Sequence, residues 1–182
     1  MISYSFRDKL EDSNNKMIER EMQAVKIFFP NANRLEIVND TVIDKLGCDV
    51  IAHYTNGNTW KIDRKMRVKG CSRFWKHGIP DLAPEIWSVV PEKWQKGIVG
   101  WTLDKTKITE WVVCTYHPED TRECYCINFY EYRQFFIDNK DMLIKYGYRT
   151  AYQNSGGWRS QCLFIPIDII RDAKIEYYME EI

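Results

Sequence analysis

Residues 48–68 read CDVIAHYTNGNTWKIDRKMRV, and this stretch decides the fold. Two runs rich in apolar residues, 48–54 and 59–68, flank the polar sequence Thr55-Asn56-Gly57-Asn58. Asn-Gly between two such runs is a strong signal for a tight turn that joins antiparallel strands. The stretch therefore predicts a β-hairpin.

The segments around this hairpin alternate between helical and strand patterns. Apolar residues at helical spacing predict a helix from Lys16 to Phe29, with Asn14 or Asn15 as its cap. The same kind of reading gives the further elements, which are strands at 34–39, 109–116 and 124–129, a helix at 130–146, a hairpin over 148–165 and a helix at 168–179. Residues 70–100, rich in Pro and Trp, are expected to form an irregular insertion. This order predicts an α/β domain whose central mixed β-sheet is flanked by helices.

Length and composition restrict the class of protein. The chain has 182 residues, 45% apolar and 29% charged, which predicts one globular domain over residues 1–182. It contains no apolar run of membrane-spanning length and no signal-peptide core at its start, so we expect no membrane partner and a cytoplasmic location. The 26 basic and 26 acidic side chains balance, which excludes a uniformly basic nucleic-acid coat but permits a local basic surface.

Three residues of the hairpin carry a recognisable arrangement of charge. Asp49 opens the first strand, and Asp63 and Lys65 lie two residues apart on the second, where alternation puts them on one face. This arrangement resembles the core motif of the PD-(D/E)xK nuclease superfamily over about residues 16–67, with Cys48 in place of the proline that names the motif. The Asp-x-Lys tripeptide also occurs at 138–140 and 172–174, but those copies fall in predicted helices or at their ends.

The resemblance implies a restriction-endonuclease-like core and hydrolysis of phosphodiester bonds with Mg²⁺ or Mn²⁺, with DNA as the favoured substrate. It implies that Asp49 and Asp63 hold the metal ion through their carboxylate oxygens. It also implies that Lys65 positions the attacking water and stabilises charge on the phosphate. A homodimer is a candidate assembly, because one active site cuts only one strand.

Members of this superfamily often supply a further acidic ligand from the preceding helix, and Glu21 is the candidate here. On a helical wheel centred on Ile18, Glu21 is the only charged residue within the apolar arc, whereas Arg20 points elsewhere. A carboxylate in that arc must be paired, protonated or metal-bound, unless it reaches solvent from the edge of the stripe. We therefore expect Glu21 to complete the metal site.

The length of the hairpin loop decides whether this site can form. A two-residue Asn56-Gly57 turn would place Asp49 opposite Arg64, on the other face of the sheet from Asp63. A three-residue loop with Gly57 in the left-handed conformation places Asp49 directly opposite Asp63. A five-residue loop also keeps the two carboxylates on one face. The nuclease interpretation therefore requires an odd loop or an equivalent bulge.

Residues 61–76 contain seven basic side chains and a single acid, in a chain that is neutral overall. Such a concentration suits a phosphate backbone, although a solvated edge strand also carries lysines. The residues that we expect to grip the backbone are Lys61, Arg67, Lys69 and Arg73.

Two other functions stay open. A catalytically inactive relative of the same fold would bind nucleic acid or a protein partner without metal-dependent turnover. The second alternative is an interaction protein stabilised by zinc. It is suggested by four potential zinc ligands that lie close together in the sequence, at Cys114, His117, Cys124 and Cys126. Their spacing includes Cys-x-Cys within a strand pattern rather than the Cys-x2-Cys of zinc knuckles, which favours buried thiols.

Overall fold

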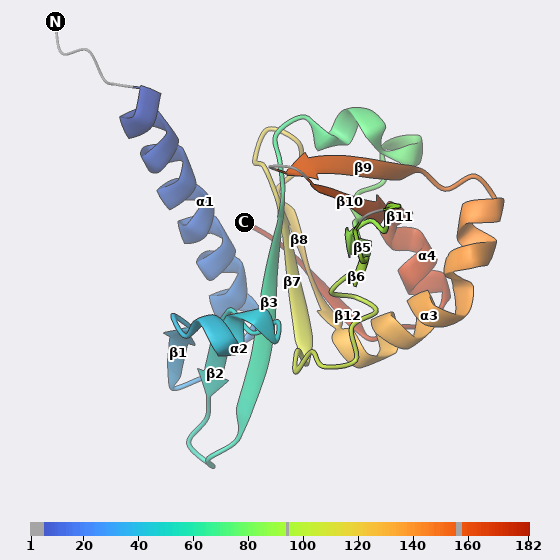
Figure 1. The fold of residues 1–182 in the computed structure, drawn as a ribbon. Coiled ribbons are helices and arrows are strands. Elements are labelled where there is room, and N and C mark those ends of the chain that lie inside the picture. Colours follow the sequence, from blue (N-terminus) through green and yellow to red (C-terminus); the bar gives the residue numbers. More distant parts are fainter. Residues whose placement is uncertain (1–5, 94, 156–157) are drawn as a thin grey trace, which may run out of the picture.

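A six-stranded mixed β-sheet forms the centre of the protein (Figure 1). The structure is a computed structural model that describes residues 6–93, 95–155 and 158–182. The order across the sheet is β1 (Arg34–Ile37), β2 (Val50–His53), β3 (Thr59–Arg67), β7 (Trp111–Tyr116), β8 (Glu123–Asn128) and β12 (Tyr177–Glu181). All neighbours are antiparallel except β3 and β7, which are parallel. The expected α/β class with a central mixed sheet is confirmed.

The β2–β3 hairpin has the odd loop that the sequence analysis requires. Val50 pairs with Ile62, which is the register that sets Asp49 opposite Asp63. Gly57 has a φ of +83° and donates its N–H to the carbonyl oxygen of Tyr54 at 3.0 Å. These features define a three-residue loop closed by a left-handed glycine. The prediction of such a loop is confirmed.

The helices differ from the predicted ones in their bounds. Helix α1 spans Phe6–Phe28, so Asn14 and Asn15 lie inside the helix and the prediction that one of them caps it is wrong. Residues 7–12 are mostly good helix formers, so the helix begins well before the two asparagines. Helix α3 (Phe129–Lys145) was expected, whereas the short α2 (Thr41–Lys45) was not. No helix in the described ranges is long and apolar enough to cross a membrane.

The C-terminal segment also departs from expectation. Helix α4 (Ile167–Asp172) is short, and the residues after it form β12 instead of continuing the predicted helix to 179. Strand β12 pairs antiparallel with β8, with Tyr178 opposite Cys126. The edge of β8 supplies backbone hydrogen-bond partners for β12, and tyrosine has a high propensity for strands.

The segment expected to be an irregular insertion contributes strands to two further sheets. A four-stranded sheet has the order β6 (Ile98–Val99), β5 (Glu85–Val89), β10 (Trp158–Leu163) and β9 (Thr150–Ser155). A two-stranded sheet pairs β4 (Asp81–Leu82) with β11 (Ile165–Pro166). The expectation of irregular structure was wrong for these strands, because β4 and β5 find partners at the far end of the chain, in β11 and β10, and β6 then pairs with β5. The short 3-10 turns Cys71–Phe74 and Lys76–Gly78 precede them.

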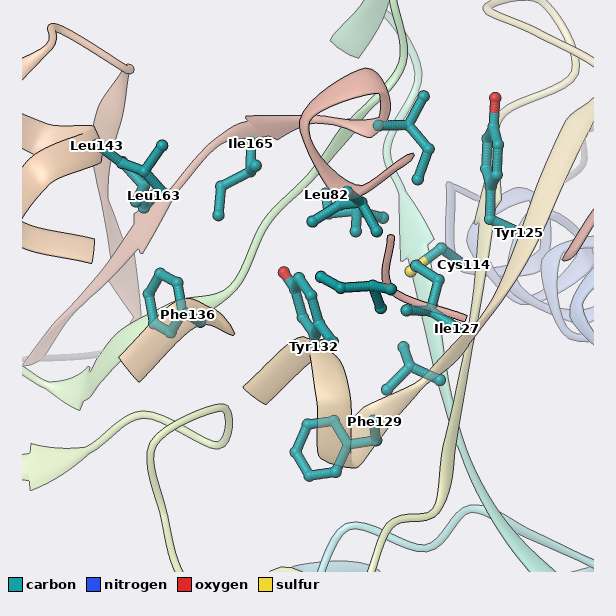
Figure 2. Packing of buried hydrophobic residues seen from close by; sticks show 14 of the residues in the cluster. Leu82, Cys114, Tyr125, Ile127, Phe129, Tyr132, Phe136, Leu143, Leu163 and Ile165 are labelled. Carbon is teal, nitrogen blue, oxygen red and sulfur yellow. The ribbon is translucent and has the colours of Figure 1, made fainter. Parts of the chain in front are cut away.

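The central sheet separates two hydrophobic cores. On one face, α1 packs through Ala24 and Val25 against Val50, Ile62 and Val113. On the other face, α3 and the smaller sheets cover a larger core, in which Phe129, Tyr132 and Phe136 approach Leu82, Leu163 and Ile165 (Figure 2). Side chains of the central strands therefore belong alternately to the α1 side and to the α3 side.

The buried stripe of α1 is rotated from the predicted one. Ile18, taken as its centre, is 44% exposed, whereas Ala24 and Val25 are fully buried. Arg20, expected to point elsewhere, faces inward and donates hydrogen bonds to the carbonyl oxygens at 116, 121 and 182, at 2.9, 3.2 and 2.9 Å. This guanidinium thus joins α1 to the end of β7, to the turn that follows it and to the C-terminal residue.

Replacing Arg20 with methionine should lower the free energy of unfolding by about 2 kcal/mol, because three partly buried carbonyl groups lose a charged donor. Urea unfolding would measure the change. The control is Gln23→Ala on the exposed side of the same helix, which should change stability by less than about 0.5 kcal/mol. Equal stability of the two variants would show that the Arg20 contacts contribute nothing.

Candidate functional site

Asp49, Asp63 and Lys65 lie on the α3 side of the central sheet. In the parallel ladder, Asp63 pairs with Val112 and Lys65 with Cys114, and both partners belong to the core on that side. Asp49 immediately precedes β2, and its backbone N–H donates to the carbonyl of Ile62 at 2.9 Å. The hairpin register therefore brings the three side chains together, as the sequence predicted.

The three side chains are joined by hydrogen bonds. Lys65 Nζ donates to Asp63 Oδ1 at 2.8 Å, and the carboxyl group of Asp63 also shares a hydrogen bond with Asp49. The second oxygen of Asp49, Oδ2, accepts the backbone N–H of Arg64 at 2.8 Å. The backbone of β3 thus orients Asp49, while Lys65 holds Asp63 from the other side.

Burial controls the charge of this group. Asp63 is only 2% exposed, and its burial is the main cause that raises the pKa of its carboxyl from 3.8 to about 7. Lys65 opposes the rise, whereas the negative charge of Asp49 adds to it. For Lys65, burial works to lower the pKa, but the charges of Asp63 and Asp49 outweigh it and hold the pKa above its usual value. Near neutral pH the carboxyl group of Asp63 therefore changes its charge, beside an ammonium that stays charged.

Glu21 faces the sheet as predicted, but from the opposite side. Its Oε2 lies 3.4 Å from Nη1 of Arg64, and each of these side chains is 14% exposed. Burial raises the pKa of Glu21, Arg64 opposes the rise and Asp49 adds to it. Because side chains alternate along β3, the Arg64 side chain lies on the α1 face and Asp63 on the other. The carboxylate of Glu21 is thus paired with an arginine.

The predicted metal set of Glu21, Asp49 and Asp63 is therefore not assembled as one cluster. Over the described residues, no group of three His, Cys, Asp or Glu side chains is close enough to hold a metal ion. Of the three predicted metal ligands, only Asp49 and Asp63 lie side by side. Glu21 acts on them indirectly, since it pairs with the side chain of Arg64, whose backbone N–H holds Asp49.

An aromatic ring and a cavity border Lys65 on the α3 side. Lys65 Nζ lies 4.9 Å from the centroid of the Trp101 ring, and that ring stacks on Phe129 at 5.5 Å. Below them is a cavity of about 210 Å³, whose lining residues include Lys65, Trp101, Cys114, Tyr132 and Cys162. The Lys65 side chain is 38% exposed, so its ammonium is accessible to a ligand from solvent. Nothing in the local sequence of Trp101 marks it as a neighbour of Lys65.

The basic run at 61–76 is largely neutralised by acids from distant parts of the chain. Lys61 lies 3.6 Å from Glu110, and Lys69 lies 2.7 Å from Glu119. Of the four residues expected to grip a nucleic-acid backbone, Lys61, Arg67 and Lys69 thus have carboxylate partners. Arg67 donates from Nε and Nη2 to Asp81 Oδ1 at 3.1 and 2.8 Å, and Arg73 lies over the ring of Phe74 at 4.6 Å.

The four potential zinc ligands do not share a site. Cys114 belongs to the core on the α3 side, whereas Cys124 and Cys126 belong to the core on the α1 side. Burial raises the pKa of each of these thiols, so they stay protonated near neutral pH. The three cysteines pack as small apolar side chains.

The raised pKa of Asp63 predicts a pH-dependent stability. The folded protein keeps a proton that an unfolded aspartate releases, so this contribution is present below about pH 4 and is lost as the pH rises through about 7. Urea unfolding in EDTA should therefore show a metal-free protein that is less stable at about pH 8 than at about pH 5. Asp63→Asn should remove this part of the pH dependence.

Added Mn²⁺ should stabilise the natural protein at the higher pH and leave Asp63→Asn unchanged, because the metal ion would need the ionised carboxylate of Asp63. The matched control is Asp138→Asn, which changes an exposed aspartate of another Asp-x-Lys tripeptide. If Asp63→Asn retained the pH dependence of the natural protein, the buried carboxyl would not be its source.

Comparison with protein-family models, with curated proteins and with solved structures found no match to this chain. The resemblance to PD-(D/E)xK nucleases therefore rests on Asp49, Asp63 and Lys65, on the hairpin register that joins them, and on no relative.

Proposed function

We propose that the protein is a metal-dependent nuclease that hydrolyses phosphodiester bonds, with DNA as the favoured substrate. The observation that carries this proposal is the contact of two aspartates and a lysine on one face of the sheet, with Asp63 buried and its pKa raised to about 7. Strongly shifted carboxyl groups beside a charged partner are typical of functional sites. A purely structural ion pair would not need the second carboxylate.

The residues fit a hard divalent cation. Asp49 and Asp63 offer carboxylate oxygens close enough to share a hydrogen bond when Asp63 is protonated. Mg²⁺ and Mn²⁺ prefer such oxygen ligands and usually keep several waters besides one or two carboxylates. When bound, the cation would polarise a phosphoryl oxygen and lower the pKa of a bound water. Asp49 and Asp63 are the residues that would hold it.

Lys65 would bind and stabilise the phosphate during the reaction. Its pKa lies above the usual value, so the side chain stays protonated and is unsuited to act as a base. A fixed ammonium beside the reacting phosphate stabilises the negative charge that develops on the oxygens. Asp63 holds this ammonium at 2.8 Å, and Trp101 covers it from the α3 side. Glu21, through Arg64, has the role of a positioning residue for Asp49.

The biological setting that we propose follows from this activity. A nuclease for cellular DNA would act in the cytoplasm, and a homodimer would bring two sites to the two strands of a duplex. Light scattering of the protein with and without duplex DNA would show whether a second copy joins.

The test is cleavage of labelled single-stranded and double-stranded DNA and RNA, with Mg²⁺, with Mn²⁺ and with EDTA. Metal-dependent cleavage should fall by about a thousandfold or more in Asp63→Asn and in Lys65→Met, because each removes charge stabilisation of the transition state. Asp138→Asn is the matched control, since it alters the same tripeptide on α3 and should cut normally.

Equal cleavage by Asp63→Asn and the natural protein would refute the assignment. Absence of cleavage with every nucleic acid, together with retained binding, would support instead an inactive protein of this architecture that binds nucleic acid or a protein partner.

A further inference from the structure

Three cations beside the C-terminal end of β3 have no carboxylate partner. Of the seven basic residues at 61–76, five form ion pairs, whereas Arg73 and Lys76 form none with any described residue. The same is true of Arg149, which lies between α3 and β9. These three side chains pack on aromatic rings instead. Lys76 Nζ lies 5.0 Å from the centroid of the Tyr148 ring.

A continuous set of cation–ring contacts links these residues to β3. The Arg149 guanidinium lies 3.8 Å from the Phe74 ring and 4.3 Å from the Phe164 ring. Arg67 approaches Phe164 at 4.6 Å, and Arg73 approaches Phe74 at 4.6 Å. We call Arg67, Phe164, Arg149, Phe74 and Arg73 the arginine–phenylalanine ladder. Such contacts hold the guanidinium planes in place without neutralising their charge.

The ladder borders a cavity of about 310 Å³. The residues that line this cavity are Phe74, Lys76, Asp81, Gly147, Tyr148, Arg149, Phe164 and Pro166. The acid among them, Asp81, is held by Arg67, so the charges of Lys76 and Arg149 are left in excess. Burial raises the pKa of Asp81, and the charges of Arg67 and Arg149 oppose the rise.

One donor at this cavity lacks an acceptor. Nη1 of Arg149 is buried and has no hydrogen-bond partner among the described residues. A buried charged donor without an acceptor is costly and calls for a missing partner. An anion with several oxygens could supply it after a small rotation of the guanidinium. Arginine offers two parallel N–H donors that match phosphate geometry.

We propose that this cavity is a second phosphate-binding subsite, which takes a phosphodiester of a single-stranded nucleic acid through Arg149 and Lys76. Phe74, a residue that is 47% exposed, lies at the edge of this cavity. The choice of nucleic acid as ligand rests on the proposed nuclease function. The subsite itself rests on the cavity and on its unpaired cations.

The position of the subsite suits a nucleic-acid strand that also reaches Lys65. Arg67 follows Asp63 by four residues on the same face of β3, which separates their backbones by about 13 Å. Lys65 lies between them. The subsite would therefore bind the nucleic-acid strand at a second phosphate, some distance from the phosphate that reacts. Its lining residues come from the segment 70–80 and from the segment after α3, among others. Figure 1 shows where these two segments lie in the fold.

Binding without cleavage tests this proposal separately from the nuclease activity. Fluorescence anisotropy with a short labelled single-stranded DNA, in EDTA, would be measured for the natural protein and for Arg149→Met and Lys76→Met. Each variant should weaken binding about tenfold and reduce the slope of log K against log salt by about one, because one phosphate contact is lost. Lys26→Met is the control, since it removes one exposed charge from α1, on the other side of the sheet.

Lys76→Met keeps the test decisive if Arg149→Met fails to fold, because Lys76 is exposed. Binding by Lys76→Met and by a folded Arg149→Met that matched Lys26→Met would overturn the subsite, whatever the outcome of the cleavage assay. A mononucleotide that bound as tightly as the oligonucleotide would also overturn it, by assigning the cavity to a free nucleotide. The expected result is about tenfold weaker binding of the oligonucleotide by both Arg149→Met and Lys76→Met. Inorganic phosphate should compete only weakly with the oligonucleotide for the natural protein.

Discussion

The left-handed conformation of Gly57 sets the pairing of β2 with β3, and the arrangement of the charged site depends on that pairing. A hairpin loop one residue shorter would turn the whole of β2 over relative to β3. Asp49 would then lie on the α1 face, and the buried carboxyl of Asp63 would lose its neighbour. The hairpin register that this glycine permits thus brings Asp49 beside the buried carboxyl of Asp63, where its charge adds to the rise of the Asp63 pKa.

The central sheet also keeps two sets of charges apart. On the α1 face, Glu21 and Arg64 form a pair that supports the sheet. On the α3 face, Asp63 and Lys65 form a pair that stays accessible through the lysine. The backbone of Arg64 connects the two sets, since its N–H holds Asp49 while its side chain holds Glu21. One strand therefore carries an ion pair on each face of the sheet.

Local patterns were sufficient for the hairpin and for the inward direction of Glu21, because each depends on residues a few positions apart. The odd loop was required by the nuclease interpretation and was decided by the structure. Local patterns failed for β12 and β5, whose partners β8 and β10 are distant in sequence. They also failed for Arg20, which lies outside the apolar arc of the helical wheel. Its side chain instead donates to the carbonyl oxygens of Tyr116, at the end of β7, and of Ile182. Contacts of this kind leave no mark on the periodicity of the helix that makes them.

The sequence by itself determined that Asp63 and Lys65 share a face, because strand alternation is a local rule, whereas it left open the length of the hairpin loop that decides the face of Asp49. Only the tertiary structure decided which cations stay unpaired. Lys61 and Lys69 meet acids some fifty positions away, at 110 and 119, whereas Arg149 lies over two phenylalanine rings and forms no ion pair within the described part of the chain. The physical reason is that Coulomb pairing depends on separations of a few ångströms in space, which distance along the chain does not set.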